Sequence, residues 1–380
     1  MNFEFALPGK IIFGPGKISE IGKVSAGFGK NALLVCDPFC VTSGLTEKIL
    51  KHLEASSVKT VIFSEVVPNP TTTSIEEAVL KARKGKCDVI IGLGGGSSID
   101  TAKAVAVGAS HPEPIWNYAI GKTPVTDKTL PVIAITTTSG TGSHCTCFSV
   151  ITNPETHQKP GMGSPYILPK IAIVDPELML SMPKALTAIC GFDVFSHAVE
   201  AYTSNASNPM SDIFAEKAIT LCSQYLPICY KDGKNLEARE MMALADTYAG
   251  IAICHAVVSL GHVVAHVIGG HYPDISHGDA LFTIYREVLV FNSKSKPMAD
   301  KHGFISRSMD KSADDIGAAF DKFFAEFAFE KKLVSKRPDI QRIGDISRET
   351  FTYMKGIADL NPVSANEDDV KLILKNSLKD

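Results

Sequence analysis

The chain has 380 residues, which is more than one hydrophobic core usually supports, so its length favours two domains. Its 45% hydrophobic and 21% charged residues are ordinary for a soluble globular enzyme. The formal net charge of -3, without a run of Lys and Arg among aromatic residues, excludes the usual electrostatic basis for binding nucleic acid or an anionic membrane.

The first half of the chain alternates short β-branched apolar runs with stretches of helical periodicity. Such strict alternation predicts a parallel sheet with helices on both faces. The predicted strands are 32–36, 60–63, 88–93 and 131–136, and the predicted helices are 45–53, 73–83 and 97–107.

After about Met182 the pattern is helical, without convincing strands. Ser364 followed by Glu367 predicts a capping box that opens the last helix, and the polar stretch 292–315 predicts a long surface connection. The other predicted helical stretches are 183–226, 235–268, 313–332 and 348–358. We therefore expect an α/β domain over residues 1–182 and an all-helical domain over 183–380.

Residues 251–270 are almost wholly apolar and about long enough to span a bilayer. The segment contains His255, His262 and His266 and has no flanking basic anchors. Because ionisable groups inside lipid are costly, we predict a buried core helix with these histidines on one stripe.

The cysteines and the N-terminus bear on the compartment. Nine cysteines, an odd number, are scattered between Cys36 and Cys254, which is typical of reduced cytosolic thiols. The N-terminal residues lack a basic region followed by an apolar stretch, so no signal peptide is expected. We predict a cytoplasmic protein.

A glycine turn joins the strand 88–93 to the helix 97–107. Glycines at 94, 95 and 96 let the backbone approach a ligand closely, and the N–H groups of the following helix favour an anion such as pyrophosphate. The spacing is not that of the usual dinucleotide-binding fold. Three glycines can also form a tight turn without a ligand, but the strand-to-helix context favours phosphate binding.

Asp37 follows the strand 32–36 at its carboxyl end. An acidic residue there can accept hydrogen bonds from ribose hydroxyls and repel a 2′-phosphate, which favours NAD over NADP. The alternative is a solvated loop aspartate before Pro38.

Two pairs of polar residues have helical spacing in the second half. Asp193 and His197 are four residues apart, as are His262 and His266, and His277 follows a turn-like stretch. One carboxylate with three imidazoles is a suitable ligand set for iron(II) or zinc. Spacing alone does not say which histidines bind.

Several motifs resemble the iron-dependent (group III) alcohol dehydrogenase family. They are residues 94–103, the Thr-Thr-Ser-Gly-Thr-Gly-Ser run at 137–143, residues 191–202, and His262 to Gly278. The likeness extends from Lys10 to Pro362 and so covers nearly the whole chain.

The resemblance implies a dehydroquinate synthase-like fold, with a dinucleotide-binding α/β domain, a helical metal-binding domain and an active site in the cleft between them. The positions that match the family's metal ligands are Asp193, His197, His262 and His277. His266 matches a histidine that lies near the substrate without ligating. The positions that match cofactor contacts are Gly95, Gly96, Ser97, Asp100, Thr137, Thr138 and Lys159.

The implied activity is hydride transfer between a small alcohol, diol or aldehyde and NAD(H), or alternatively NADP(H). The implied metal is Fe²⁺, with Zn²⁺ or another divalent ion as alternatives, and the implied assembly is a homo-oligomer, a dimer or higher. Two other functions are alternatives. A lyase or cyclase of the dehydroquinate synthase type needs basic residues around its substrate, and few lie near Asp193 or His262. A binding protein on a retired enzyme scaffold is indicated only by His144.

His144 follows Ser143 at a position where many relatives have Glu. An imidazole at the cofactor would become cationic below its ordinary pKa of about 6.5 and would favour an anionic dinucleotide at acidic pH. The alternative is a bystander that points away from the cofactor.

Overall fold

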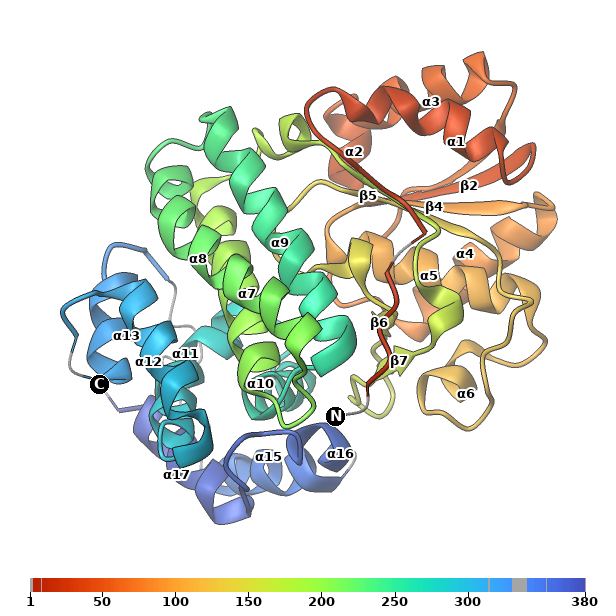
Figure 1. Cartoon of the computed structure of the whole chain (residues 1–380). Helices are drawn as coiled ribbons and strands as arrows, with labels where there is room; N and C mark the ends of the chain where they lie inside the picture. The colour runs from red at the N-terminus through yellow and green to blue at the C-terminus, as the bar shows by residue number, and fades with distance from the viewer. Residues whose placement is uncertain (1–2, 8, 314, 330–339, 353, 380) are drawn as a thin grey trace. The chain divides into compact units, whose positions relative to one another are not determined.

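The computed structural model describes residues 3–7, 9–313, 315–329, 340–352 and 354–379. The chain divides into two compact units, one of Ala6–Ser181 and the other of Met182–Asp380 together with Met1–Phe5. Figure 1 shows the sheet with its helices in the first unit and helices throughout the second. The expected class, a parallel-sheet α/β part followed by a helical part, is confirmed.

The first unit is built on a six-stranded parallel sheet with the order β1-β8-β5-β4-β2-β3. Both faces of this sheet are covered, which explains why its strands are apolar at successive positions. In β2, Leu33 and Val35 face one hydrophobic cluster, whereas Leu34 and Cys36 face another. The strands are β1 Ile11–Phe13, β2 Asn31–Cys36, β3 Lys59–Phe63, β4 Val89–Gly94, β5 Val132–Thr136 and β8 Ile171–Val174.

The helices of the first unit lie on opposite faces of the sheet. The helices α1 and α3 share a cluster with Leu34, and α4, α5 and α6 share one with Leu33. Their bounds are α1 Ile21–Ala26, α2 Pro38–Thr42, α3 Leu45–Ala55, α4 Thr72–Lys84, α5 Gly96–Ser110 and α6 Ile115–Ala119. Short 3-10 helices are η1 Lys17–Glu20, η2 Ser143–Cys145, η3 Pro165–Ile167 and η4 Pro176–Met179.

The four predicted strands and three predicted helices of this unit are confirmed within a few residues. The short strands β1 and β8, three and four residues long, were not predicted because so few residues carry little periodic signal. A small antiparallel hairpin, β6 Phe148–Val150 with β7 Gly161–Gly163, was also not predicted.

Among the described residues of the second unit, the regular elements are all helices. α7 is nearly surrounded by other helices and is buried along most of its length, in contact with α8 and α9. The helices are α7 Lys184–Thr203, α8 Pro209–Lys231, α9 Leu236–Ala256, α10 Leu260–His271, α11 His277–Asn292, α12 Ala299–Met309, α13 Ile316–Phe324, α15 Ile340–Thr352, α16 Lys355–Ala358 and α17 Glu367–Ser377, with η5 at Lys296–Met298.

Two predictions for this unit are wrong in detail. The stretch 292–315 is not a surface connection, since it contains η5 and α12, whose His302 and Ile305 are buried. The last helix is capped by Asn366 and Asp369, two residues beyond the predicted box. The predicted helix 313–332 runs partly outside the described residues.

The prediction of one core helix over 251–270 is also wrong. α9 ends at Ala256 and α10 begins at Leu260, and the two axes differ by 97°. At the break, Val257 has φ 58° and ψ 170°, a backbone conformation that interrupts the helical hydrogen bonding. Among the described residues, no single helix has the length and hydropathy to cross a membrane, and α9 with α10 would do so only as this bent pair.

The break also separates the three histidines that were expected on one stripe. His255 lies on α9, where its ring stacks on Phe5 with centroids 4.0 Å apart. His262 and His266 lie on α10. His255 is therefore not part of the stripe that contains the other two.

Candidate active site

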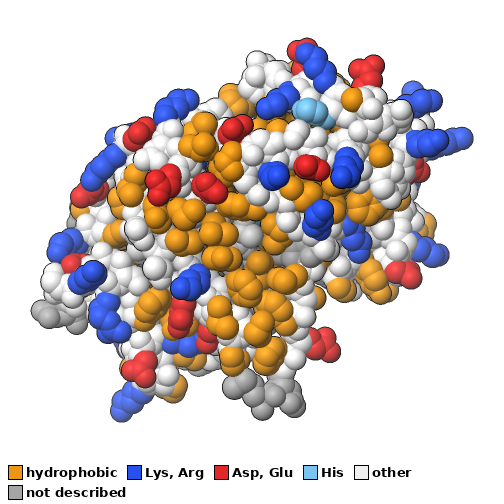
Figure 2. Space-filling model, turned by 45° about the horizontal axis from the view of Figure 1, so that its top comes forward, with side chains coloured by type: hydrophobic (Ala, Val, Ile, Leu, Met, Phe, Trp, Pro, Cys, Tyr) orange, Lys and Arg blue, Asp and Glu red, His pale blue; other side chains and the backbone are white. Residues whose placement is uncertain are grey.

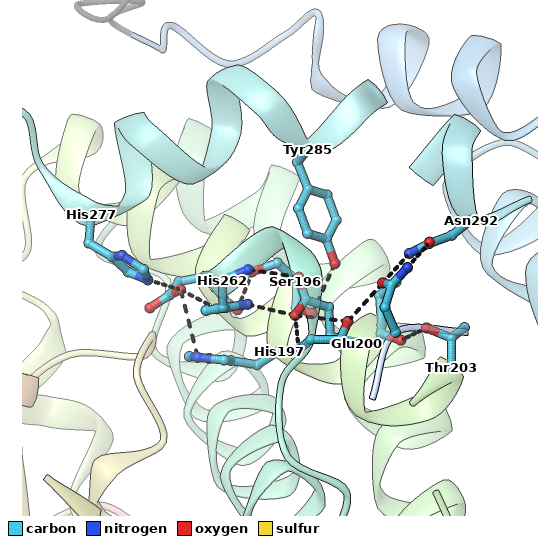
Figure 3. A network of polar contacts seen from close by, with 12 residues as sticks. Ser196, His197, Glu200, Thr203, His262, His277, Tyr285 and Asn292 are labelled. Carbon is cyan, nitrogen blue, oxygen red and sulfur yellow. Dashed lines mark hydrogen bonds and ion pairs between the residues drawn. The ribbon is translucent and has the colours of Figure 1, made fainter. Parts of the chain in front are cut away.

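Polar side chains gather in the helical unit where α7, α10 and α11 meet. Asp193 and His197 come from α7, His262 from α10, and His277 is the first residue of α11. The Nε2 atoms of His262, His277 and His197 lie 3.6, 3.8 and 3.9 Å from one oxygen, Oδ1 of Asp193. These four predicted ligands are thus brought together, and Figure 3 shows the histidines from three helices directed toward the same place.

The separations are too long for hydrogen bonds and suit ligands of a common ion. Zinc binds imidazole nitrogen and carboxylate oxygen at about 2.0–2.2 Å. In its tetrahedral sites, two ligand atoms of the same ion are therefore separated by roughly 3 Å or more. The ligand atoms of Asp193, His262 and His277 all lie within 4.8 Å of one another. Asp193 and His262 are buried, with exposed fractions of 5% and 2%. The residues present fit a divalent metal.

Buried polar atoms with no hydrogen bond support the same interpretation. Among the described residues, Oδ1 of Asp193 and Nε2 of His262 have no hydrogen-bond partner, and Nδ1 of His262 has only the ion-pair contact with Glu200. Leaving such atoms unsatisfied is costly, and a cation between Oδ1 and Nε2 would satisfy both. Burial alone would lower the pKa of His262, but the carboxylates of Glu200 and Asp193 outweigh it and raise the pKa to about 9. The surroundings therefore favour positive charge.

His277 is positioned by the N-cap of α11. Ser276 is the N-cap of α11, its hydroxyl accepts from the backbone N–H of Asp279, and it donates to that carboxylate over 2.6 Å. Gly278 lies against α7, where a Cβ would be 2.2 Å from Ile189. The Ser-x-x-Asp pattern of residues 276–279 is a helix-start signal that is visible in the sequence.

Glu200 is a residue of the site that was not predicted from the sequence. It lies seven residues after Asp193 on α7 and is 1% exposed, and its Oε2 is 3.1 Å from Nδ1 of His262. Its spacing from Asp193 and His197 places it on the same helix face, which is the signal that could have identified it.

His266 lies beside the cluster without belonging to its tightest group. Its ring is 5.1 Å from that of His277, in a T-shaped arrangement. The rings of His197 and His262 stack with centroids 4.4 Å apart. The position of His266 is compatible with the role expected for it, a histidine near the reacting atoms rather than a ligand.

In the α/β unit, the predicted cofactor residues meet at the carboxyl ends of β2, β4 and β5. Gly94 has φ 141°, and a Cβ there would lie 3.0 Å from Oδ2 of Asp37. A Cβ on Gly95 would be 3.3 Å from Oγ1 of Thr138. The backbone N–H of Thr137 donates to the carbonyl of Gly94 over 3.1 Å.

The glycine turn at 94–96 leads directly into α5, as expected for a phosphate-binding helix start. Gly95 is the N-cap without a side-chain hydrogen bond, α5 begins at Gly96, and Gly95, Gly96 and Ser97 remain partly exposed. Free N–H groups at the start of a 15-residue helix are a suitable anion site. Asp37 also has a structural part, since its carboxylate caps α2 by accepting from the N–H of Cys40.

Asp100 and Lys159 are engaged inside the protein. The Asp100 carboxylate accepts from Ser143 Oγ at 2.6 Å and from the N–H of Val150 at 2.9 Å. Burial raises the pKa of Asp100, and Lys103 and Ser143 oppose this shift. Lys159 is buried and donates to Oδ1 of Asn69 over 2.7 Å.

Lys103 is another residue whose role was not predicted from the sequence. It is completely buried and donates to the hydroxyls of Ser143 and Thr146 and to the carbonyl of Phe148. Its ammonium thereby fixes the segment that follows Thr138 against α5. Nothing in the sequence distinguishes such a lysine from a solvated one on a helix surface.

The expected titration of His144 is contradicted by the structure. His144 is 1% exposed, and burial, with a smaller effect of Lys103, lowers its pKa to about 3. The imidazole is therefore neutral at the pH values where an enzyme works. The expectation that it strengthens cofactor binding as the pH falls toward 6.5 is wrong.

Comparison with known proteins gives matches along the whole chain. The profile of iron-containing alcohol dehydrogenases matches residues 8–176, and that of the C-terminal domain of the same family matches residues 187–378. The NAD-dependent methanol dehydrogenase of Bacillus methanolicus is 33% identical over 378 residues, which cover 99% of this chain and 93% of that protein.

Two further similarities involve other substrates and a solved structure. The 1,3-propanediol dehydrogenase of Klebsiella pneumoniae is 33% identical, covering 99% of this chain and 98% of that one. The crystal structure of an archaeal halo-thermophilic alcohol dehydrogenase from a Red Sea brine pool has a TM-score of 0.94 at 37% identity, covering 100% of this chain and 99% of that one.

Proposed function

The chain belongs to the iron-containing alcohol dehydrogenase family, and on that premise we propose that it is an NAD(H)-linked dehydrogenase of small alcohols with one divalent metal per chain. The observation that carries the proposal is the arrangement of three imidazole Nε2 atoms 3.6–3.9 Å from one oxygen of Asp193. The proposed ligands are Asp193, His197, His262 and His277.

The metal, Fe²⁺ by family with Zn²⁺ as an alternative, would supply Lewis acidity that lowers the pKa of an alcohol hydroxyl or polarises an aldehyde carbonyl. The residues of the chain would bind the metal and transfer the substrate proton. Asp193 contributes the negative charge of the ligand set, and His197 and His262 stack to form a buried wall. His266, beside His277, would accept or return the substrate proton.

Nicotinamide cofactor would provide or accept the hydride. We assign its pyrophosphate to the N–H groups of Gly95, Gly96 and Ser97 at the start of α5. Asp37, at the end of β2, would accept from ribose hydroxyls and disfavour a 2′-phosphate. Four further residues complete the proposed cofactor set: Asp100, Thr137, Thr138 and Lys159.

The substrate class we propose is primary alcohols, diols and the corresponding aldehydes, in line with relatives named for methanol and 1,3-propanediol. We further propose a cytoplasmic enzyme, because all nine cysteines are free thiols, four of them in the helical unit.

A homo-oligomer, a dimer or higher, is also part of the proposal. Met210 and Ile213, three residues apart on α8, are 37% and 55% exposed, and Figure 2 shows hydrophobic side chains among charged ones on the face that it draws. Contiguous exposed apolar patches mark interaction surfaces, and we propose that these two side chains belong to a surface that packs against another subunit. Light scattering after size exclusion measures the assembly directly.

The activity is tested by metal analysis of protein purified without air, followed by NADH oxidation with short aldehydes and by diol-dependent NAD reduction. His262→Ala should lose both metal and turnover. His266→Ala, one turn further along the same helix, serves as the matched control and should keep its metal while losing mainly rate. A metal-free His266 variant beside a metal-loaded His262 variant would contradict the proposed ligand set.

A further inference from the structure

Glu200 is a buried carboxylate in the last turn of the largely apolar helix α7. Burying such a group is costly unless hydrogen-bond donors surround it. Three hydrogen bonds and one ion-pair contact do so, all with Ser259 and His262 at the start of α10. Oε2 accepts from the N–H and hydroxyl of Ser259 and lies 3.1 Å from Nδ1 of His262, while Oε1 accepts from the N–H of His262 over 3.2 Å.

The backbone contacts make Glu200 the cap of α10. Ser259 is the N-cap residue of this helix, but its own side chain makes no capping hydrogen bond. Glu200 takes that place from the neighbouring helix and brings a negative charge to the N-terminus of α10, where the helix dipole favours it. The helices α7 and α10 are therefore joined at the start of α10, the helix that carries His262.

The side-chain contact determines which nitrogen of His262 is available. Nδ1 lies 3.1 Å from Glu200, and Nε2 lies 3.6 Å from Asp193, so each ring nitrogen faces one carboxylate (Figure 3). The carboxylate beside Nδ1 favours the tautomer that carries its hydrogen there, which leaves the lone pair of Nε2 for a metal. A carboxylate behind a ligating imidazole orients the ring and increases its basicity.

The anchor extends beyond Glu200. The hydroxyl of Ser259 also lies 3.3 Å from Oδ1 of Asn361, and Asn361 and Asn292 exchange two amide hydrogen bonds of 2.6 and 3.0 Å. These contacts hold the start of α10 to the end of α11 and to the segment after α16. Ser259, which donates to Glu200, is thus also held by Asn361.

We propose that Glu200 is a positioning residue of the metal site, which holds His262 in the tautomer and orientation that present Nε2 beside Asp193. This inference rests on the proposed function, because it gives Glu200 its role through a metal ligand. It requires a carboxylate, since both oxygens of Glu200 face donors. A glutamine of the same size would turn its NH₂ group toward one set of those donors.

The test compares cobalt and zinc binding by metal-free wild type, Glu200→Gln and Glu216→Gln. Glu216 lies on α8 and accepts from the hydroxyl of Tyr202, away from the histidines, so it controls for the chemical change itself. We expect Glu200→Gln to bind Co²⁺ and Zn²⁺ about 10–100-fold more weakly. The visible Co²⁺ bands should change, and the rise in Tm on adding Zn²⁺ should shrink. Glu216→Gln should match wild type in all three.

A purely structural cap would give a different result. Glu200→Gln would then lower the Tm of the metal-free protein but leave the cobalt spectrum and both dissociation constants unchanged, and this outcome overturns the inference. If the glutamine variant does not fold, Glu200→Asp keeps the charge but withdraws it by one methylene, and wild-type metal affinity in that variant would equally overturn it.

The variant His262→Ala distinguishes a failure of the proposed role of Glu200 from a failure of the proposed metal-ligand set. Loss of cobalt binding in His262→Ala with retention in Glu200→Gln would contradict only the role of Glu200. Equal cobalt binding by wild type and His262→Ala would contradict the proposed ligand set, and the inference with it.

Discussion

Gly261 lies against Glu200 so closely that a Cβ on Gly261 would be 2.3 Å from Oε1 of the carboxylate. The same Cβ would lie 3.1 Å from the ring of Tyr285, which is fully buried. The residue that precedes His262 is therefore restricted to glycine by the carboxylate that holds His262 in place.

Gly261→Ala should consequently damage both stability and metal binding. Overpacking of this kind costs about 1–3 kcal/mol, and relief of the clash has to move Glu200 away from His262. We expect a lower Tm and weaker Zn²⁺ binding. Gly344→Ala is the matched control, because no atom lies within 4 Å of its added Cβ in the helix α15. That variant should be neutral or more stable by about 0.5–1 kcal/mol. Equal effects of the two substitutions would refute the close-contact argument.

Val257 stores backbone strain immediately before α10, the helix that carries His262. Its φ of 58° with ψ of 170° belongs to a region that is essentially restricted to glycine. Such strain costs about 1–3 kcal/mol, and Val257→Gly should recover part of it.

Val258→Gly is the appropriate comparison, since Val258 is also half-buried but does not have a positive φ. Both variants lose a side chain and add chain flexibility, but only Val257→Gly removes strain. We expect chemical denaturation to show Val257→Gly at least about 1 kcal/mol more stable than Val258→Gly. The reverse order would mean that the turn is unstrained.

Much of the α/β unit was predictable because its signals are local. Each of β2, β3, β4 and β5 is an apolar run between turn residues. The glycines at 94–96 predicted the start of α5. The gathering of Asp193, His197, His262 and His277 was expected from their types, spacing and family resemblance. Their common approach to one oxygen atom depends on how three helices pack, which spacing does not determine.

The predictions for residues 251–270 and for His144 were wrong because tertiary contacts override the local sequence pattern there. Residues 251–270 look like one helix because every position is compatible with helix. The break at Val257 is stabilised from outside, by Glu200 on α7 taking the N–H groups of Ser259 and His262. His144 was expected to titrate because its neighbours in sequence suggested a cofactor-facing turn, whereas its burial is determined by residues distant in the chain.

Asp37 should control the choice between NAD(H) and NADP(H), but the structure changes how this is best tested. Because its carboxylate caps α2 at Cys40, Asp37→Gly would remove the cap together with the charge. Asp37→Asn keeps a good N-cap residue and removes only the charge. We expect the ratio of kcat/KM for NADPH to that for NADH to rise about tenfold, or roughly 1.4 kcal/mol.

Asp127→Asn, at an exposed loop position of the same unit, is the control for a charge change and should leave the ratio unaltered. If the unmodified enzyme already prefers NADPH by a wide margin, or if Asp37→Asn leaves the ratio unchanged, Asp37 does not face the 2′ position of the ribose.

His144 should affect stability at acidic pH rather than cofactor binding. Its pKa is lowered from the ordinary 6.5 to about 3 by burial, with Lys103 adding to the effect. Between these two values the unfolded chain binds a proton that the folded protein does not. The contribution of His144 to stability is therefore complete above pH 6.5 and is lost as the pH falls from 6.5 toward 3.

His144→Gln removes the titrating group but keeps polar atoms at the site. It should flatten the fall of Tm between pH 6.5 and 4, relative to wild type, and leave the pH dependence of the NADH dissociation constant unchanged. His157→Gln, at an exposed position of the same unit, should reproduce the wild-type profile of Tm. A steeper fall of Tm in His144→Gln than in wild type would show that the buried imidazole takes up its proton more readily in the folded protein than in the unfolded chain. In that case a cationic His144 beside Lys103 would have to be stabilised by a carboxylate, and Asp100, which already lies 4.0 Å from the Lys103 ammonium, would be the first group to substitute.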